Sequence, residues 1–327
     1  ATGVIFGGEY GALRRPVAVK MLHEHLVDDA AVARMFAEAR ALSLVDHPGI
    51  VKVFDVGMVD GRVCIVLERL VGEPLSARLA RERLSEERLV LFARQLASAL
   101  EAAHAAGIVH RDLKPENVFI VADPEVPGGE RVKVIDFGIA KHAGADENTA
   151  TGVVLGTPTY MAPERWDRVV DSRVDIYSLG VVIYVMATGE LPFSGTTNEL
   201  LAEHAYCAPP RAVDLGCASS WLSSIIERCL AKRPQDRFPT MGALAAALRD
   251  LEQAISAPTS PTPRCEPDDS DEEVTIAAQR ARGSTQRVVK RAPTRRRAID
   301  RLPRWPLAVA FALLWAICVL ALVGDAP

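Results

Sequence analysis

Four side chains that could act on a phosphate-bearing ligand stand in three short stretches: Lys20 at the end of VAVK, Asp112 and Asn117 in HRDLKPEN, and Asp136 at the start of DFG. Carboxylate and amide oxygens are the ligands that Mg²⁺ takes in proteins, and lysine binds phosphate as a point charge. A carboxylate can also receive a proton from a reacting hydroxyl. Together the four residue types suit transfer chemistry on a metal-bound phosphate.

The first seventy residues have the pattern of a small sheet with one helix. Short β-branched runs stand at 17–22, 51–56 and 63–67, and GMVDGR between the last two is a turn-rich hairpin signal. Between the first two runs, residues 30–45 place apolar side chains at helical spacing. These elements would carry Lys20 on a strand.

The next part of the chain is predicted to be mostly helical. Residues 86–106 repeat apolar side chains on one helical face and stop at Gly107. The remaining predicted elements are two strands at 118–121 and 132–135, and helices at about 172–188, 219–231 and 240–255. The two strands flank a loop that carries PEVPGGE.

Charge and cysteine content exclude several classes of protein. The net charge is −4, and residues 1–255 carry 27 Lys/Arg against 34 Asp/Glu, which argues against nucleic acid as a partner. The six cysteines form no CxxC pair and have no histidine at ligand spacing, so free thiols are expected and not a metal site or disulfide framework.

The last 70 or so residues change character. SAPTSPTP is a proline-rich linker, EPDDSDEE at 266–273 is acidic, and 280–304 is strongly basic. Such charge blocks are usually disordered. Residues 306–323 are then eighteen residues without a charge, preceded by Trp305. At 1.5 Å per residue this run spans about 27 Å, enough for a transmembrane helix.

VAVK, HRDLKPEN, DFG and APE (162–164) stand in the order found in protein kinases. Over about residues 3–255 the chain resembles the eukaryotic-type (Hanks-type) serine/threonine kinases of bacteria. The resemblance implies an α+β, bilobal fold with a small β-rich N-lobe (1–70) over a larger helical C-lobe (71–255). The remainder divides into the linker (256–304), a transmembrane helix (305–323) and a short tail (324–327).

The resemblance implies ATP and Mg²⁺ as cofactors and gives each polar residue a role. Lys20 would bind the α/β-phosphates, with Glu38 in MFAEAR as the carboxylate that holds it. Asp136 and Asn117 would bind Mg²⁺. Asp112 would take the proton of the substrate hydroxyl.

Two further features favour the serine/threonine class over the tyrosine class. Lys114 is placed to meet the γ-phosphate, and GTPTYMAPE suits a serine/threonine peptide substrate. By the same resemblance, the residues that enclose adenine or contact it through the hinge are Ile5, Ala18, Phe119, Leu67 as gatekeeper, Glu68 and Leu70.

The segment between DFG and APE contains a TxT pair, Thr149 and Thr151, placed like the autophosphorylated pair of bacterial relatives. Phosphate on either threonine could pair with Arg111, next to Asp112, and order the loop. Autophosphorylation between two copies would make a homodimer possible. Ordinary loop threonines remain the alternative.

Four residues are expected to support the site without taking part in the chemistry. Thr157 resembles the residue that supports the catalytic aspartate, and Asp175 would brace the catalytic loop from the helix beneath. Glu164 of APE would form an ion pair with Arg237 in KRPQDRF. His110 is expected to be a packed core histidine and not an acid or base.

The glycine-rich start, ATGVIFGGEYGALRRPVAVK, allows two registers. Either Gly7, Gly8 and Gly11 form the phosphate loop, or Gly3 is its last glycine, roughly seventeen residues before Lys20 as in kinases. We prefer the second, which places Gly7 to Gly11 in the strand and turn after the loop. It also implies that the first strand of the N-lobe is missing from an N-terminally incomplete sequence.

The basic run before the apolar segment predicts a single-pass protein of the inner or plasma membrane with a cytoplasmic kinase domain. Taken together, the sequence predicts a membrane-bound protein serine/threonine kinase of bacterial signalling. The alternatives are a membrane-tethered pseudokinase scaffold, which the incomplete glycine loop favours, and a small-molecule phosphotransferase, which the long peptide-binding segment disfavours.

Overall fold

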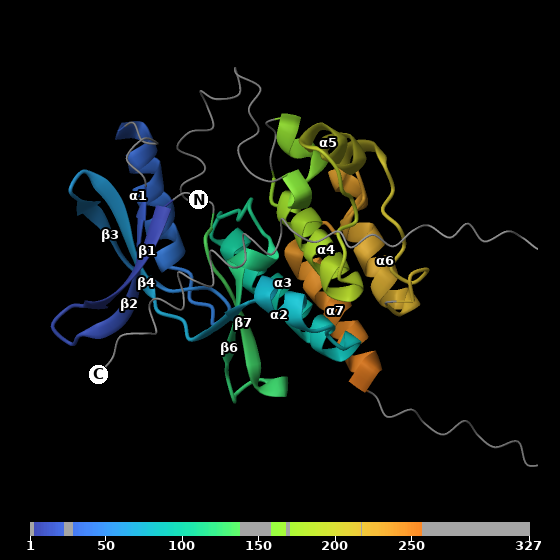
Figure 1. Cartoon of the computed structure of the whole chain (residues 1–327), viewed down its shortest axis with the longest axis horizontal. Helices are drawn as coiled ribbons and strands as arrows, with labels where there is room; N and C mark the ends of the chain where they lie inside the picture. Colours follow the sequence, from blue (N-terminus) through green and yellow to red (C-terminus); the bar gives the residue numbers. More distant parts are fainter. Residues whose placement is uncertain (1–2, 23–28, 138–157, 168–170, 217, 257–327) are drawn as a thin grey trace, which may run out of the picture. The chain divides into compact units, whose positions relative to one another are not determined.

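The computed structural model describes residues 3–22, 29–137, 158–167, 171–216 and 218–256. The chain divides into two compact units, Ala1–Ala257 and Pro258–Pro327, and every described residue belongs to the first. This unit is bilobal, with a small sheet and one helix followed by a larger helical part (Figure 1), as the sequence predicts. None of the helices in these ranges has the length and apolar character needed to cross a bilayer. The predicted apolar span lies outside the described residues.

The N-lobe is an antiparallel sheet of β1 (Gly3–Tyr10), β2 (Arg15–Leu22), β3 (Val53–Val59) and β4 (Arg62–Glu68), in the order β1-β2-β4-β3. Gly7 and Gly8 lie inside β1, and Gly11 lies in the turn after it with φ +70°. These are the strand and turn in which the preferred register of the glycine-rich start places Gly7 to Gly11. Asp60 and Gly61, both at positive φ, form a tight turn between β3 and β4.

Helix α1 (Asp29–Ser43) packs against this sheet (Figure 1). Its apolar face buries Met35, Ala39 and Leu42, each at most 3% exposed. They join the same core as Leu22 of β2 and Ile65 of β4. The helix predicted at 30–45 is thus present with boundaries shifted by one or two residues, as helix ends commonly are.

The C-lobe is built from α2 (Leu75–Arg81), α3 (Glu86–Ala105), α4 (Arg173–Thr188), α5 (Thr197–Tyr206), α6 (Ser220–Cys229) and α7 (Met241–Ser256). Helix α4 is its centre: it contacts α3, α6 and α7 and is buried along nearly its whole length. Gly180 of α4 meets α6 so closely that a Cβ there would lie 2.5 Å from the Cβ of Cys229. Helix α2 has only seven residues, and α5 buries only Leu200 and His204, so neither shows the apolar spacing that predicts a helix, and neither was predicted.

A second antiparallel sheet consists of β5 (Gly72–Pro74), β6 (Val118–Ala122) and β7 (Glu130–Val134), with α2 and α3 between β5 and β6 in the chain, and it contacts both lobes. Val134 exchanges backbone hydrogen bonds with Gly49 and Val51 of the N-lobe, at 2.8 and 3.1 Å. Val118 faces Val134 in the β6–β7 register, and Ile135 N–H donates to the Asn117 carbonyl at 2.9 Å. This pairing brings HRDLKPEN and Asp136 to one end of the hairpin.

Candidate active site

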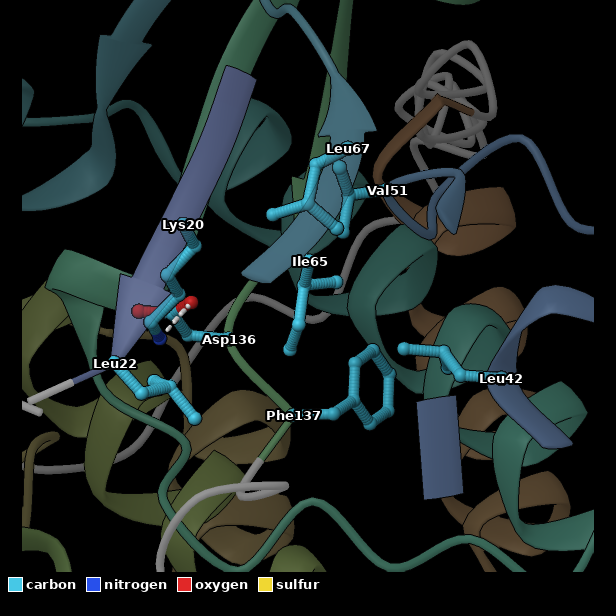
Figure 2. Close-up of a pocket in the computed structure, with 8 residues that line it drawn as sticks. All are labelled: Lys20, Leu22, Leu42, Val51, Ile65, Leu67, Asp136 and Phe137. Carbon is cyan, nitrogen blue, oxygen red and sulfur yellow. Dashed lines mark hydrogen bonds and ion pairs between the residues drawn. The ribbon is translucent and has the colours of Figure 1, made fainter. Parts of the chain in front are cut away.

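An ion pair joins the two lobes at the centre of the candidate site. Lys20 Nζ of β2 lies 2.6 Å from Asp136 Oδ1, just after β7, although the residues are 116 positions apart (Figure 2). The Lys20 side chain is only 11% exposed, so its charge needs a nearby carboxylate. Asp136 has φ +56°, a conformation unusual for a residue with a Cβ. The structure thus brings together two of the four residues that the sequence predicts to bind phosphate or metal.

Behind this pair lies a cavity of about 20 Å³, room for about one water molecule. Its apolar lining consists of Leu22, Leu42, Val51, Ile65, Leu67 and Phe137 (Figure 2). Phe137 is 4% exposed and its ring centroid lies 4.7 Å from that of His110. The DFG phenylalanine therefore links α1, the N-lobe sheet and the HRDLKPEN loop through packing.

The expected partnership of Glu38 with Lys20 is not found in this structure. Within the described part of the chain, Lys20 pairs with Asp136 and not with Glu38. Burial raises the pKa of the Glu38 carboxyl to about 7, against the attraction of Arg111 and Arg34. The carboxyl of Glu38 thus lies within electrostatic range of Arg111 and Arg34, while the Lys20 ammonium is paired with Asp136.

The HRDLKPEN loop is braced from α4, as predicted. The Asp175 carboxylate, 0% exposed, accepts the N–H groups of His110 and Arg111, each at 2.8 Å. His104 Nε2 lies 2.8 Å from the same carboxylate. Burial alone would raise the pKa of Asp175, but the hydrogen bonds from His104 and from the Arg111 N–H lower it below its ordinary value. The part played by His104 was missed; its only signal is that it precedes His110 by six residues.

His110 connects the loop to the strand that carries Asp136. Its Nε2 lies 3.1 Å from the Ile135 carbonyl, and its Nδ1 accepts the Asp112 N–H at 3.2 Å. This pattern requires a neutral ring protonated at Nε2. Burial lowers the pKa of His110, which keeps the ring neutral. The residue is a buried connector, in agreement with the prediction that it is not an acid or base.

Asp112, Lys114 and Asn117 meet within the loop. Asn117 Nδ2 donates to the Asp112 carbonyl at 2.8 Å and to its carboxylate at 3.2 Å, and Lys114 Nζ lies 3.5 Å from Asp112 Oδ2. Asn117 is 6% exposed and lies in a short 3-10 helix, η2 (Pro115–Asn117), that runs directly into β6. Its amide nitrogen is occupied by Asp112, which leaves its carbonyl oxygen as a possible metal ligand.

Three of the residues expected around adenine, Ile5, Ala18 and Leu67, share one face of the N-lobe sheet. Ile5 is opposite Lys20, and Ala18 is opposite Leu67, so these four side chains share one face of the N-lobe sheet. Gly3 begins β1 opposite Leu22. In β6, Phe119 points away from the buried Val118 and Ile120 and is half-buried; Glu68 ends β4, and Leu70 follows in the connection to β5.

The ion pair predicted between Glu164 of APE and Arg237 of KRPQDRF is present. Arg237, 2% exposed, donates to both carboxylate oxygens of Glu164 at 2.6 and 2.8 Å. Three carbonyl groups accept its other N–H groups, and its guanidinium lies 4.8 Å from the Tyr177 ring centroid. The predicted Thr149, Thr151 and Thr157 lie outside the described residues.

Comparisons with known proteins agree with this geometry. The family profile "Protein kinase domain" matches residues 1–248. Serine/threonine-protein kinase Pkn1 of Myxococcus xanthus is 42% identical over 252 residues, which cover 76% of this chain and 36% of that protein. Serine/threonine-protein kinase PknE of Mycobacterium tuberculosis is 37% identical over 250 residues, 75% of this chain and 43% of that protein. The chain thus spans less than half of the length of these relatives.

Solved structures show the same fold. The kinase domain of Mycobacterium tuberculosis PknI superposes with a TM-score of 0.61 at 25% identity, covering 76% of this chain and 91% of that one. Rad53 1–466 in complex with AMP-PNP gives a TM-score of 0.63 at 27% identity, covering 75% of this chain and 61% of that one.

Proposed function

The chain belongs to the protein kinase family, and we propose that it transfers the γ-phosphoryl group of ATP to serine and threonine hydroxyls of proteins. The observation that carries this proposal is the meeting of the Asp112–Asn117 loop with the Lys20–Asp136 pair at one end of the β6–β7 hairpin. Kinase chemistry needs a cation for the phosphates, metal ligands and a carboxylate for the acceptor hydroxyl in one cleft.

The oxygen donors present fit Mg²⁺. Asn117 offers its carbonyl oxygen, since its amide nitrogen is bonded to Asp112, and Asp136 offers the carboxylate oxygen that Lys20 does not contact. Both are the hard donors that this ion prefers. When bound, the ion would neutralise phosphate charge and align the γ-phosphoryl group.

Three residues of the protein have different roles in the phosphoryl transfer. Asp112 accepts a hydrogen bond from the substrate hydroxyl, aims its oxygen at the γ-phosphorus and receives its proton late in the step. The new bond forms between that oxygen and phosphorus while the bond to the β,γ-bridging oxygen breaks, and ADP leaves. Lys114, 3.5 Å from Asp112, stands where it can contact the γ-phosphoryl oxygens, and Lys20 holds the α/β-phosphates.

Activation would require Glu38 to move. In the proposed active form, Glu38 binds Lys20, and Asp136 is released to the metal. Phosphorylation of Thr149 or Thr151 would place a strong anion near Arg111 and draw Arg111 away from Glu38. Because each copy would phosphorylate another, transient homodimers are part of this proposal.

The location proposed is the cytoplasmic face of the bacterial membrane, with residues 305–323 as a single span. The support is compositional: eighteen uncharged residues follow a run rich in arginine. Fractionation of cells that express the chain, with and without residues 305–323, tests it. Recovery of the full chain in the carbonate-soluble fraction would refute the span.

An assay with labelled ATP distinguishes the proposed protein kinase from a pseudokinase and from a small-molecule phosphotransferase. The chain is incubated with γ-labelled ATP and a panel of serine, threonine and tyrosine peptides and small alcohols, beside Asp112→Asn. The control is Asp214→Asn, an aspartate whose side chain is 65% exposed. We expect labelled serine and threonine peptides with the chain and with the control, and none with Asp112→Asn. Label only on small alcohols would identify a small-molecule phosphotransferase, and no label on any acceptor would favour the pseudokinase.

A further inference from the structure

The peptide group that joins Arg111 to Asp112 is held at both ends by side chains. Its carbonyl oxygen accepts a hydrogen bond from Arg165 Nη1. Its N–H, which belongs to Asp112, donates to His110 Nδ1 at 3.2 Å. Arg111 has φ +62°, a conformation that residues with a Cβ adopt only at an energy cost. The orientation of this one peptide plane decides where the Asp112 side chain leaves the backbone.

Arg165 is itself firmly placed. It lies in the short 3-10 helix η6 (Pro163–Asp167) directly after Glu164, which Arg237 holds through two hydrogen bonds. Its own N–H donates to the Ala162 carbonyl at 3.2 Å. The frame from which the Arg165 side chain reaches Arg111 is therefore tied to the core of the C-lobe.

The positive charge of Arg165 also interacts with the carboxylates around the HRDLKPEN loop. Burial lowers the pKa of Arg165, while the carboxylates of Asp112 and Asp175 act in the opposite direction. Arginine stays protonated under such conditions, where lysine loses its proton more readily. A half-buried cation within range of Asp112 is not required by the Glu164–Arg237 ion pair, so its position needs another explanation.

We propose that Arg165 is a positioning residue for Asp112: it fixes the carbonyl of the Arg111–Asp112 peptide and so sets the direction from which the Asp112 carboxylate meets the substrate hydroxyl. This inference rests on the phosphotransfer function proposed above. It adds a contact from the segment after APE to the loop that carries the proton acceptor. Because the carbonyl belongs to the backbone of Arg111, this contact does not involve the Arg111 side chain.

A misdirected proton acceptor slows the chemical step more than it weakens nucleotide binding, since Asp112 contacts the hydroxyl and not the nucleotide. We therefore expect Arg165→Gln to lower kcat by about 10- to 100-fold and to leave KM for ATP within about twofold. Arg165→Lys keeps a donor and a charge but lacks the planar fork, and it should recover part of kcat. The control is Arg233→Gln, which removes the same charge from a side chain that is 71% exposed.

Backbone hydrogen exchange gives a readout that does not depend on activity. In Arg165→Gln the amides of residues 110–117 should exchange faster, while those of α4 and α6 keep their protection. Unchanged kcat in an active enzyme, unchanged exchange at 110–117, or equal loss of protection throughout the C-lobe would each overturn the proposal. If the unaltered chain transfers no phosphate, the proposed function fails, and the exchange comparison still decides the role of Arg165.

Discussion

Replacing Arg237 by methionine tests how much the buried ion pair with Glu164 contributes to the C-lobe. Methionine has a similar length but no donors, so the Glu164 carboxylate, 14% exposed, is left in place without its partner. The carbonyl groups of Arg173, Ala231 and Lys232 also lose a donor. Removing one member of a buried pair costs about 3–5 kcal/mol, because the other charge stays buried.

For a domain of this size, such a loss corresponds to a fall in Tm of about 6–20 °C. The assay is thermal and urea unfolding of Arg237→Met, Glu164→Gln and the double variant. Glu164→Gln removes the buried charge, so the double variant should cost less than the sum of the two single changes. Arg233→Met is the matched control: its pair with Asp236 is largely exposed and should contribute at most about 1 kcal/mol.

The reasoning is refuted if Arg237→Met loses no more stability than Arg233→Met. It is also refuted if the two single changes add without coupling, because then the carboxylate of Glu164 is not stranded by the loss of Arg237. Either outcome would mean that solvent or neighbouring groups satisfy Glu164 when the guanidinium is gone.

Three further predictions concern packing, pH and activation. Gly180→Ala should destabilise the protein by about 1–3 kcal/mol in urea unfolding, because the added Cβ would lie 2.5 Å from the Cβ of Cys229. The control Gly57→Ala, with no atom within 4 Å of its new Cβ, should leave the free energy of unfolding nearly unchanged. Because the folded pKa of Asp175 lies below its ordinary value, the carboxylate stabilises the fold above that ordinary value, and this contribution is lost as the pH falls through the folded pKa. Tm of Asp175→Asn should therefore be lower than that of the unaltered chain at neutral pH but less sensitive to acid, and parallel curves of Tm against pH would contradict this. Alanine at both Thr149 and Thr151 should lower kinase activity severalfold, and unchanged turnover would exclude activation through this pair.

Much of the bilobal fold follows from local patterns that the sequence displays. The β-branched runs VAVK and VCIVL and the helical spacing of 86–106 are properties of neighbouring residues, so the corresponding strands and the long helix were predicted to within a few positions. Helix α2 is too short for such a pattern, and α5 buries too few apolar side chains to show it. Helix α4 is buried on all sides, so its boundaries came from the residues that end it, above all Gly189 at φ +72°.

The types of residue in the candidate site, and their order, were determined by the sequence alone. Lysine, aspartate and asparagine in VAVK, HRDLKPEN and DFG are what phosphate and metal chemistry need, wherever the chain places them. The tertiary structure decided which side chains become partners. Lys20 forms an ion pair with Asp136 and not with Glu38, His104 lies within hydrogen-bond distance of Asp175, and Arg165 donates to the Arg111 carbonyl. Ion pairs and hydrogen bonds form only within about 3–4 Å. These partners are 54 to 116 positions apart in the sequence. Whether their side chains come within that distance depends on how the lobes and helices pack, and the spacing of neighbouring residues does not encode this packing.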